Sequence, residues 1–240
     1  SDVCSSDLMN WLIRHKRILL HFNMAFIGGL TGAYAILVRG GNFGAAQTMN
    51  LIEMVLDFAD LKFYDALIRV SIFIGYGIAI VAAFLIPLYL PKYKYYIALI
   101  FEVLCIAISG LIPLSANPLL ALFPVFILNA YQWQTFTDPD CYNSSTIFST
   151  NNYKQTLLSW TKYIREKDLA QKRRAWIFTD TLIFFHIGVL FGYYAVKFLS
   201  EKGIWLTFLP IMTALILVSP VFEYHTITVE SKSSSLPSRN

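Results

Sequence analysis

Apolar residues run in long blocks along this chain, and two shorter stretches with a polar face interrupt them. A helix needs about 20 residues to cross a hydrocarbon core of roughly 30 Å. The runs that meet this length are Ile18–Val38, Leu67–Leu90, Tyr95–Pro113, Pro118–Thr137, Ala175–Val196 and Gly203–Phe222. The pattern therefore predicts an all-α polytopic membrane protein with six transmembrane helices.

The two polar stretches, 46–60 and 146–162, lie between these runs and match each other at an offset of 102 positions. Thr48, Asn50 and Glu53 in the first correspond to Thr150, Asn152 and Gln155 in the second. With 3.6 residues per turn, positions 50, 53, 57 and 60 share one helix face, so each stretch is predicted to be a short helix with a polar stripe.

The repeated order of elements predicts a relation between the two halves of the chain. Each half, 18–113 and 118–222, contains a span, a short helix and two more spans. Because three crossings is an odd number, the second half enters the membrane from the opposite side. We therefore predict two inverted repeats of three spans, an arrangement that many transporters use to build a site near mid-membrane.

The basic residues predict the orientation, because Lys and Arg favour cytoplasmic loops. If both short helices are re-entrant and the N-terminus is cytoplasmic, most of the 19 Lys and Arg residues lie inside. Only Arg39, Lys62, Arg69, Lys197 and Lys202 are then placed outside. Helices lying flat at the interface give the same sidedness, so the charges leave both alternatives open. Either way, both termini are predicted to be cytoplasmic.

Composition agrees with a membrane protein, since 56% of residues are hydrophobic and 14% charged, against about 25% charged in soluble domains. Residues 1–8 resemble the translated read-through of a sequencing adapter, and we interpret them as an assembly artefact that precedes Met9. A genuine polar N-terminus is the alternative. Residues 9–225 are predicted to form a single membrane domain, and the serine-rich residues 226–240 a disordered tail.

Five short patches carry a resemblance to a known family. Residues 28–33, 39–43, 47–50, 128–130 and 149–152 read Gly-Gly-Leu-Thr-Gly-Ala, Arg-Gly-Gly-Asn-Phe, Gln-Thr-Met-Asn, Leu-Asn-Ala and Ser-Thr-Asn-Asn. Their order and spacing resemble the YoaK-like family of bacterial membrane proteins, the domain of unknown function numbered 1275. The resemblance implies a six-span protein of the bacterial inner membrane, without a defined activity.

This chain departs from the family pattern at four positions. Gly32 lies where the family tends to have Asp, and Leu128 replaces Gln. Met49 and Asn151 replace the glycines of the two Thr-Gly-Asn-like motifs. If those residues contribute to transport, this member differs in its solute or in its coupling.

The heads of the two short helices are the candidate solute pathway, because helix N-termini present unpaired N–H groups and partial positive charge. Simple helix capping by Thr and Asn is the alternative. The residues predicted to line the pathway are Gln47, Thr48, Asn50, Glu53, Asn129, Thr150, Asn152 and Gln155.

Three ionisable residues lie within the apolar runs, where a charge near the bilayer centre costs about 2.5–3.5 kcal/mol on insertion scales. Glu102, Asp180 and His186 are candidates for a proton relay, and a structural hydrogen-bond cluster is the alternative. Gly28, Gly29 and Gly32 form a small-residue face that close helix packing explains.

The sequence shows no arrangement typical of an enzyme, a metal site or a cofactor site, so none is predicted. The expected partners are the lipid bilayer and a small solute, without nucleic acid, and the oligomeric state, homo-oligomer included, stays open. The leading hypothesis is a transporter or channel for a small polar or anionic solute, with its site where the two short helices meet. The alternative is a non-transporting scaffold or accessory subunit.

Overall fold

The computed structural model describes residues 2–45, 47–136 and 142–219, and their regular secondary structure is entirely helical. The predicted tail at 226–240 lies outside the described residues. In chain order the elements are α1 (Asp2–Val38), α2 (Gln47–Ala59), α3 (Phe63–Tyr89), η1 (Pro91–Tyr93), α4 (Lys94–Leu111), α5 (Pro118–Thr135), α6 (Ser149–Glu166), α7 (Leu169–Leu199), η2 (Ser200–Thr207) and α8 (Phe208–Val218). Helix α1 includes residues 2–8.

Four stretches of the described chain are long and apolar enough to cross a membrane: His15–Val38, Phe63–Tyr89, Pro91–Leu111 and Leu169–Val218. The last contains α7, η2 and α8 as one continuous helical stretch, in which α8 has 11 residues. Helix α5 is not among the four because Asn129, Gln132 and Gln134 lower its hydropathy. The structure thus supports a membrane-type helical protein, with fewer clear spans than the six predicted.

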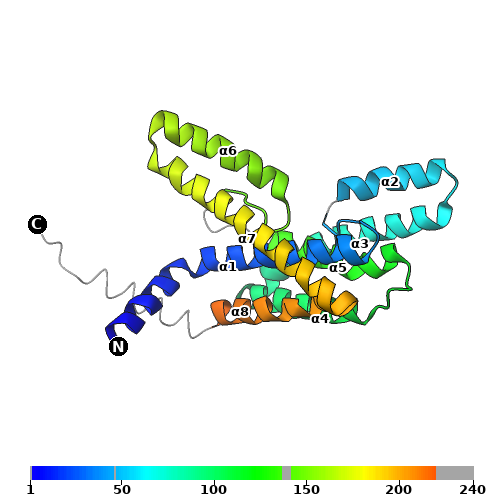
Figure 1. The fold of residues 1–240 in the computed structure, drawn as a ribbon, viewed down its shortest axis with the longest axis horizontal. Helices are drawn as coiled ribbons and strands as arrows, with labels where there is room; N and C mark the ends of the chain where they lie inside the picture. The colour runs from blue at the N-terminus through cyan, green and yellow to red at the C-terminus, as the bar shows by residue number, and fades with distance from the viewer. Residues whose placement is uncertain (1, 46, 137–141, 220–240) are drawn as a thin grey trace, which may run out of the picture.

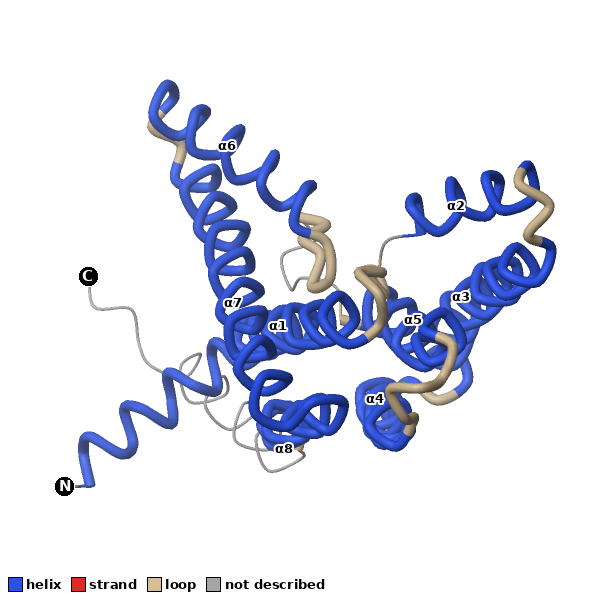
Figure 2. The backbone as a smooth tube through the Cα atoms, turned by 45° about the vertical axis from the view of Figure 1, so that its right-hand side comes forward, coloured by secondary structure: helices blue, strands red, loops and turns tan. Residues whose placement is uncertain are grey.

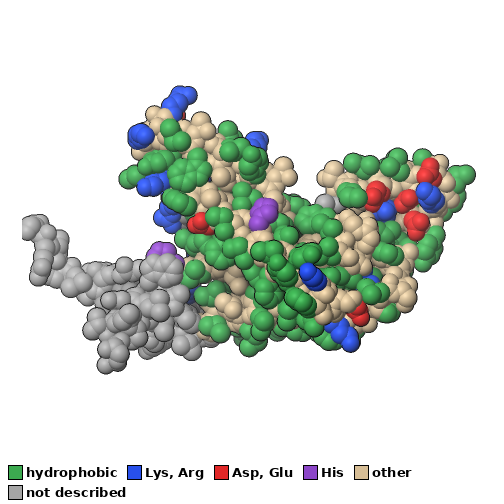
Figure 3. Space-filling view, viewed as in Figure 1, with side chains coloured by type: hydrophobic (Ala, Val, Ile, Leu, Met, Phe, Trp, Pro, Cys, Tyr) green, Lys and Arg blue, Asp and Glu red, His purple; other side chains and the backbone are tan. Residues whose placement is uncertain are grey.

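Helix α1 forms the centre of the molecule, because 72% of its apolar window is buried, compared with 22% for α3. Helix α5 is also buried along much of its length. The outer helices expose apolar side chains such as Phe84 and Ile78 to the surroundings. Hydrophobic side chains cover much of the visible body, and charged ones gather on two projections (Figure 3). An apolar exterior of this kind suits contact with lipid.

The helices exchange packing partners between the two halves of the chain. Helix α1 packs chiefly along α7, and α5 packs chiefly along α3 (Figure 1). Helix α4 packs against α5, and α8 against α1. Among the described helices, α2 contacts only α3 and α6 contacts only α7, so two helical hairpins project from the body (Figure 2).

Glycines allow α1 and α7 to cross with their backbones in contact. A Cβ atom at Gly29 would collide with the carbonyl oxygen of Phe185, and one at Gly188 with that of Phe26. The close packing predicted for the glycine face of α1 is therefore present at Gly29, whereas Gly32 faces the ring of Phe43. Close approach of this kind is typical of membrane helices with small residues at their interface.

Arg39 is a buried cation that ties the end of α1 to the end of α4. Its side chain is 1% exposed and donates to the carbonyl oxygens of Ile112 and Pro113, at 2.7 and 3.0 Å, and to the hydroxyl of Tyr34. These carbonyls follow the last turn of α4, where the helix dipole favours a positive charge. From the sequence, Arg39 is predicted only to be one of the basic residues on the outer side.

Candidate functional site

The polar stripe of α2 faces α3, where Arg69 binds it. The Arg69 guanidinium lies 2.6 Å from Glu53 and 2.8 Å from Asp57. Asn50 is 3% exposed, and its amide contacts Arg69 and the side chain of Gln47. Asn50, Glu53 and Asp57 therefore all contact Arg69 within their own hairpin.

At the tip of the same hairpin, Lys62 donates to Asp60 at 2.8 Å, and both side chains are exposed. This hydrogen bond raises the pKa of Lys62 above its ordinary value. Exposed pairs of this kind add little stability.

The polar stripe of α6 is held in a similar way by α7 and by the segment that precedes α6. Arg174 donates to Gln155 at 2.9 Å, and the indole of Trp160 donates to Thr179 at 3.0 Å. Asn152 is 2% exposed and bonds the backbone of Ser145, accepting from its N–H and donating to its carbonyl oxygen. Asn152 therefore fixes the shape of residues 144–145 and does not cap α6, whose N-cap is Phe148.

The two short helices do not contact each other in the described residues, so the predicted meeting of α2 and α6 is not observed. The reason is that each helix turns its polar face toward an arginine of its own hairpin. Their N-terminal ends point toward one another across an open notch (Figures 1, 2 and 3). Thr48 is exposed at the head of α2, and Thr150 is exposed at the head of α6.

A buried polar layer lies where α1, α5 and α7 surround the segment 142–148. The Oγ of Ser144 lies 3.1 Å from both His21 Nε2 and Thr181 Oγ1. Gln132 donates to Thr146 Oγ1 and to the carbonyl oxygen of Met24. Three of the residues predicted from the sequence lie at this layer or beside its segment. Asn129 accepts a hydrogen bond from Thr31, Asn152 accepts one from Ser144, and Thr150 lies with Phe148 in the wall of a cavity.

This layer depends on irregular backbone before α6, where the sequence predicts helix. Residues 146–148 were predicted to be helical, but α6 begins at Ser149 and Phe148 has extended dihedral angles. The segment fits against α1 because a side chain at Gly28 would collide with the carbonyl oxygen of Thr146. The run Asn143-Ser144-Ser145-Thr146, rich in residues that bond their own backbone, was the available signal.

A cavity of about 720 Å³ lies at the N-terminal end of α6. Its walls are largely apolar, and they come from α1, from Phe43 ahead of α2, and from α7. Its polar lining consists of the head of α6, namely Ser149, Thr150 and Asn151, with Lys154 one turn along. Lys154 is the single charge among the described residues that line it. The cavity thus combines an apolar wall with a positively polarised end.

The three residues considered for a proton relay do not lie together. Glu102 is fully buried on α4, and α4 makes no contact with α7 in the described part of the chain. Asp180 is half-buried on α7, and His186 is exposed, with Nδ1 2.7 Å from the carbonyl oxygen of Leu182. A relay through all three has no continuous geometry in this structure.

These features define an all-helical protein of the membrane type, with two polar-faced hairpins and a cavity between the halves of the chain. The chain belongs to the family described as protein of unknown function DUF1275, whose model matches residues 20–218. No curated protein matches the chain. No solved structure matches it either.

Proposed function

We propose that this protein is a transporter or channel for a small polar or anionic solute, bound in the cavity at the head of α6. The observation that carries the proposal is the composition of that cavity. Its volume of about 720 Å³ is within the size range of small-molecule sites. Unpaired helix N–H groups and the Lys154 ammonium attract negative charge, and the apolar walls favour a solute with a non-polar body.

We further propose that the chain is built from two inverted repeats with six spans. Helices α1, α2, α3 and α4 would correspond to α5, α6, α7 and the η2–α8 stretch. The exchange of packing partners supports this, because α1 against α7 and α5 against α3 are then equivalent contacts. In Figure 1, α1 and α7 run one way across the view and α3 and α5 run the other, as inverted halves would.

The charges on the two hairpins support an orientation in a bacterial inner membrane. The α6–α7 hairpin carries Lys162, Arg165, Lys172, Arg173 and Arg174, whereas the α2–α3 hairpin carries Asp57, Asp60 and Asp65 beside its basic residues. The two tips lie at opposite ends of the molecule in Figure 1. The positive-inside rule then places the α6–α7 tip in the cytoplasm. With 13 residues, α2 spans roughly 20 Å and is too short to cross alone.

The test is solute flux in proteoliposomes, with a panel of chloride, sulfate, phosphate and small mono- and dicarboxylates. We expect at least one anion to produce a current on a solid-supported membrane. Replacing Lys154 with Gln (K154Q) should raise the half-saturating concentration of that anion about tenfold, since one lost charge contact of about 1.4 kcal/mol corresponds to that factor.

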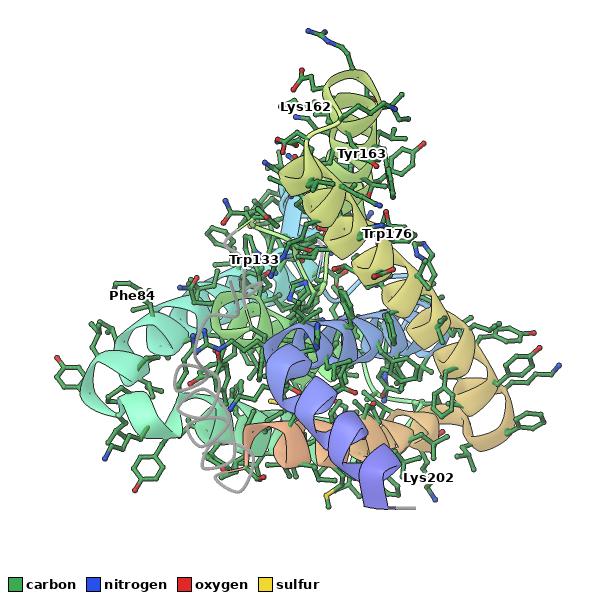
Figure 4. All side chains as sticks on the ribbon, turned by 90° about the vertical axis from the view of Figure 1, so that its left-hand side faces the viewer. Phe84, Trp133, Lys162, Tyr163, Trp176 and Lys202 are labelled. Carbon is green, nitrogen blue, oxygen red and sulfur yellow. The ribbon has the colours of Figure 1, made fainter. Side chains whose placement is uncertain are left out.

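Lys162 provides the matched control, because it lies on the same helix, exposed at the end far from the cavity (Figure 4). The K162Q variant has the same change in net charge and should leave the half-saturating concentration unchanged. Equal effects of K154Q and K162Q would place the site elsewhere. A folded, reconstituted protein that moves no solute of the panel would contradict the proposed function and favour a scaffold.

A further inference from the structure

Glu102 is a carboxyl group in the interior of the molecule that the cavity does not use. Its side chain is 0% exposed, and neither carboxylate oxygen has a hydrogen-bond partner in the described residues. The structural alternative, a satisfied hydrogen-bond cluster, requires such partners. A buried carboxylate without partners is costly, whereas a neutral carboxylic acid is far less so.

The elements around Glu102 supply no cation that would stabilise its charged form. Helix α4 packs against α5 and α8, neither of which contains Asp, Glu, Lys, Arg or His. On α5 the nearest titratable group is Tyr131, whose ring packs on Phe101. Neighbouring elements carry further titratable groups, but in the described residues no ion pair joins any of them to Glu102. These groups are Lys92 on η1; Asp65, Arg69 and Tyr76 on α3; Glu201 and Lys202 on η2; and Lys94, Tyr95, Tyr96 and Cys105 on α4 itself.

A polar stripe leads from Glu102 toward the end of α4 at Arg39. Cys105 and Ser109 follow Glu102 at helical spacing on the buried face, over about 10 Å at 1.5 Å per residue. Ser109 donates to the carbonyl oxygen of Cys105, and Tyr34 donates to that of Ser109 at 2.9 Å. Arg39 then donates to the Tyr34 hydroxyl. This stripe places hydrogen-bonding groups between that end of the molecule and Glu102.

We propose that Glu102 is a proton-binding site of this protein, neutral in the present conformation and exchanging its proton along the Cys105–Ser109–Tyr34 stripe when the conformation changes. Proton binding follows from the burial and isolation of the carboxyl group alone. Its role in driving transport rests on the proposed function. In that role the proton would be the coupling ion, taken up and released at a residue separate from the solute cavity.

The first test uses dicyclohexylcarbodiimide, an apolar reagent that reacts with protonated carboxyl groups inside membranes. The acid O–H adds across one C=N bond to give an O-acylisourea, which rearranges to a stable N-acylurea without a leaving group. We expect a mass adduct on the Glu102 peptide of the full chain in liposomes. Once the pH is high enough for Glu102 to lose its proton to the medium, each further pH unit should slow the labelling about tenfold.

Internal controls make this test decisive. Glu53 and Asp57, paired with Arg69, should remain unlabelled, and half-buried Asp180 reports whether the reagent reaches the protein. The E102Q variant, a neutral isostere, should fold and lack the adduct. If it does not fold, the wild-type peptide map still decides. Labelling of Asp180 without Glu102, or labelling of Glu102 that does not change with pH, overturns the proposal.

The route is tested at Cys105, which becomes the remaining thiol when the other two cysteines are replaced in C4S/C141S. A membrane-impermeant thiosulfonate reagent applied to the Arg39 side should modify Cys105 slowly, and the same reagent on the opposite side should not. Modification only from the opposite side would overturn the proposed route.

The two proposals fail in different ways. If Glu102 is labelled as expected but no anion of the panel moves, the transport function is wrong and proton binding stands. If an anion moves but Glu102 is not labelled, proton binding at Glu102 is wrong and the transport function stands. If both succeed, E102Q should abolish the response of the anion current to an imposed pH gradient. An unchanged response in E102Q would remove Glu102 as the coupling residue.

Discussion

At the residue scale, the crossing of α1 and α7 depends on the absence of side chains. Gly29 and Gly188 each lie against a carbonyl oxygen of the facing helix, and Gly192 lies against Leu30 and Ala33. Backbone cannot move aside as a flexible side chain can, so a methyl group at Gly29 or Gly188 must separate the two helices. The buried layer around Ser144 and Thr181 depends on this same close approach.

We therefore expect Gly29→Ala and Gly188→Ala to destabilise the protein by about 1–3 kcal/mol, the usual cost of overpacking. The measurement is the yield of monodisperse protein and its thermal midpoint in detergent. Gly77→Ala is the matched control, because nothing lies within 4 Å of an added Cβ there. It should be neutral or slightly stabilising, since Ala favours helix by about 1 kcal/mol over Gly. Equal losses of stability at all three positions would contradict a particular role for the glycine contacts at the α1–α7 crossing.

At the element scale, each short helix turns its polar face inward and an apolar face outward. On α2 the inward face is bound by Arg69, whereas Ile52, Val55 and Leu56 are exposed. The Arg69 side chain thus supplies the ion pairs that join α2, a helix of 13 residues, to α3. The same logic holds on α6, where Arg174 and Thr179 receive the polar face.

Replacing Arg69 with Gln should release α2, because Glu53 and Asp57 would then lie half-buried without their cation. Removing one partner of such a pair is strongly destabilising, at about 3–5 kcal/mol for a buried one and less here because the pair is partly exposed. The measurement is hydrogen–deuterium exchange, which should accelerate in residues 47–62 while α5 keeps its protection. Lys62→Gln, which removes only the exposed pair with Asp60, should change little. Unchanged exchange in Arg69→Gln would refute the role of Arg69.

The sequence predicted both short helices and the position of their polar faces, because helical periodicity determines which residues share a face. It could not tell whether those faces bind a solute or a neighbouring helix, since both require the same spacing. The deciding residues, Arg69 and Arg174, were visible as basic residues near the start of the following helices. The irregular backbone at 142–148 was not predictable from periodicity, because its shape depends on tertiary bonds from Asn152 and Gln132.

At the scale of the whole molecule, two hairpins face each other across a notch (Figure 3) and are joined through the α1–α7 and α3–α5 contacts. Alternating access in inverted-repeat transporters largely occurs by the rocking of one part against another. In this protein such a motion would change the distance between the heads of α2 and α6. It would leave the geometry within each hairpin constant.

Spin labels at the exposed residues Thr48 and Thr150 test this motion by pulsed electron resonance. We expect their distance distribution to shift when the anion identified in the flux panel is added. A control pair at Thr48 and Ser71, both exposed within the α2–α3 hairpin, should not shift. A change in the control pair alone, or in neither pair, would contradict hairpin motion as the basis of access.

The exchange of packing partners between the halves has a consequence for how the protein is made. Synthesis proceeds from the N-terminus, and domains usually fold as their residues emerge. Here α1 emerges before its principal partner α7, because α2 to α6 lie between them in the chain. Until α7 emerges, Gly29 on α1 has no Phe185 backbone to pack against. We therefore expect the packing of α1 to be completed only when α7 has been translated.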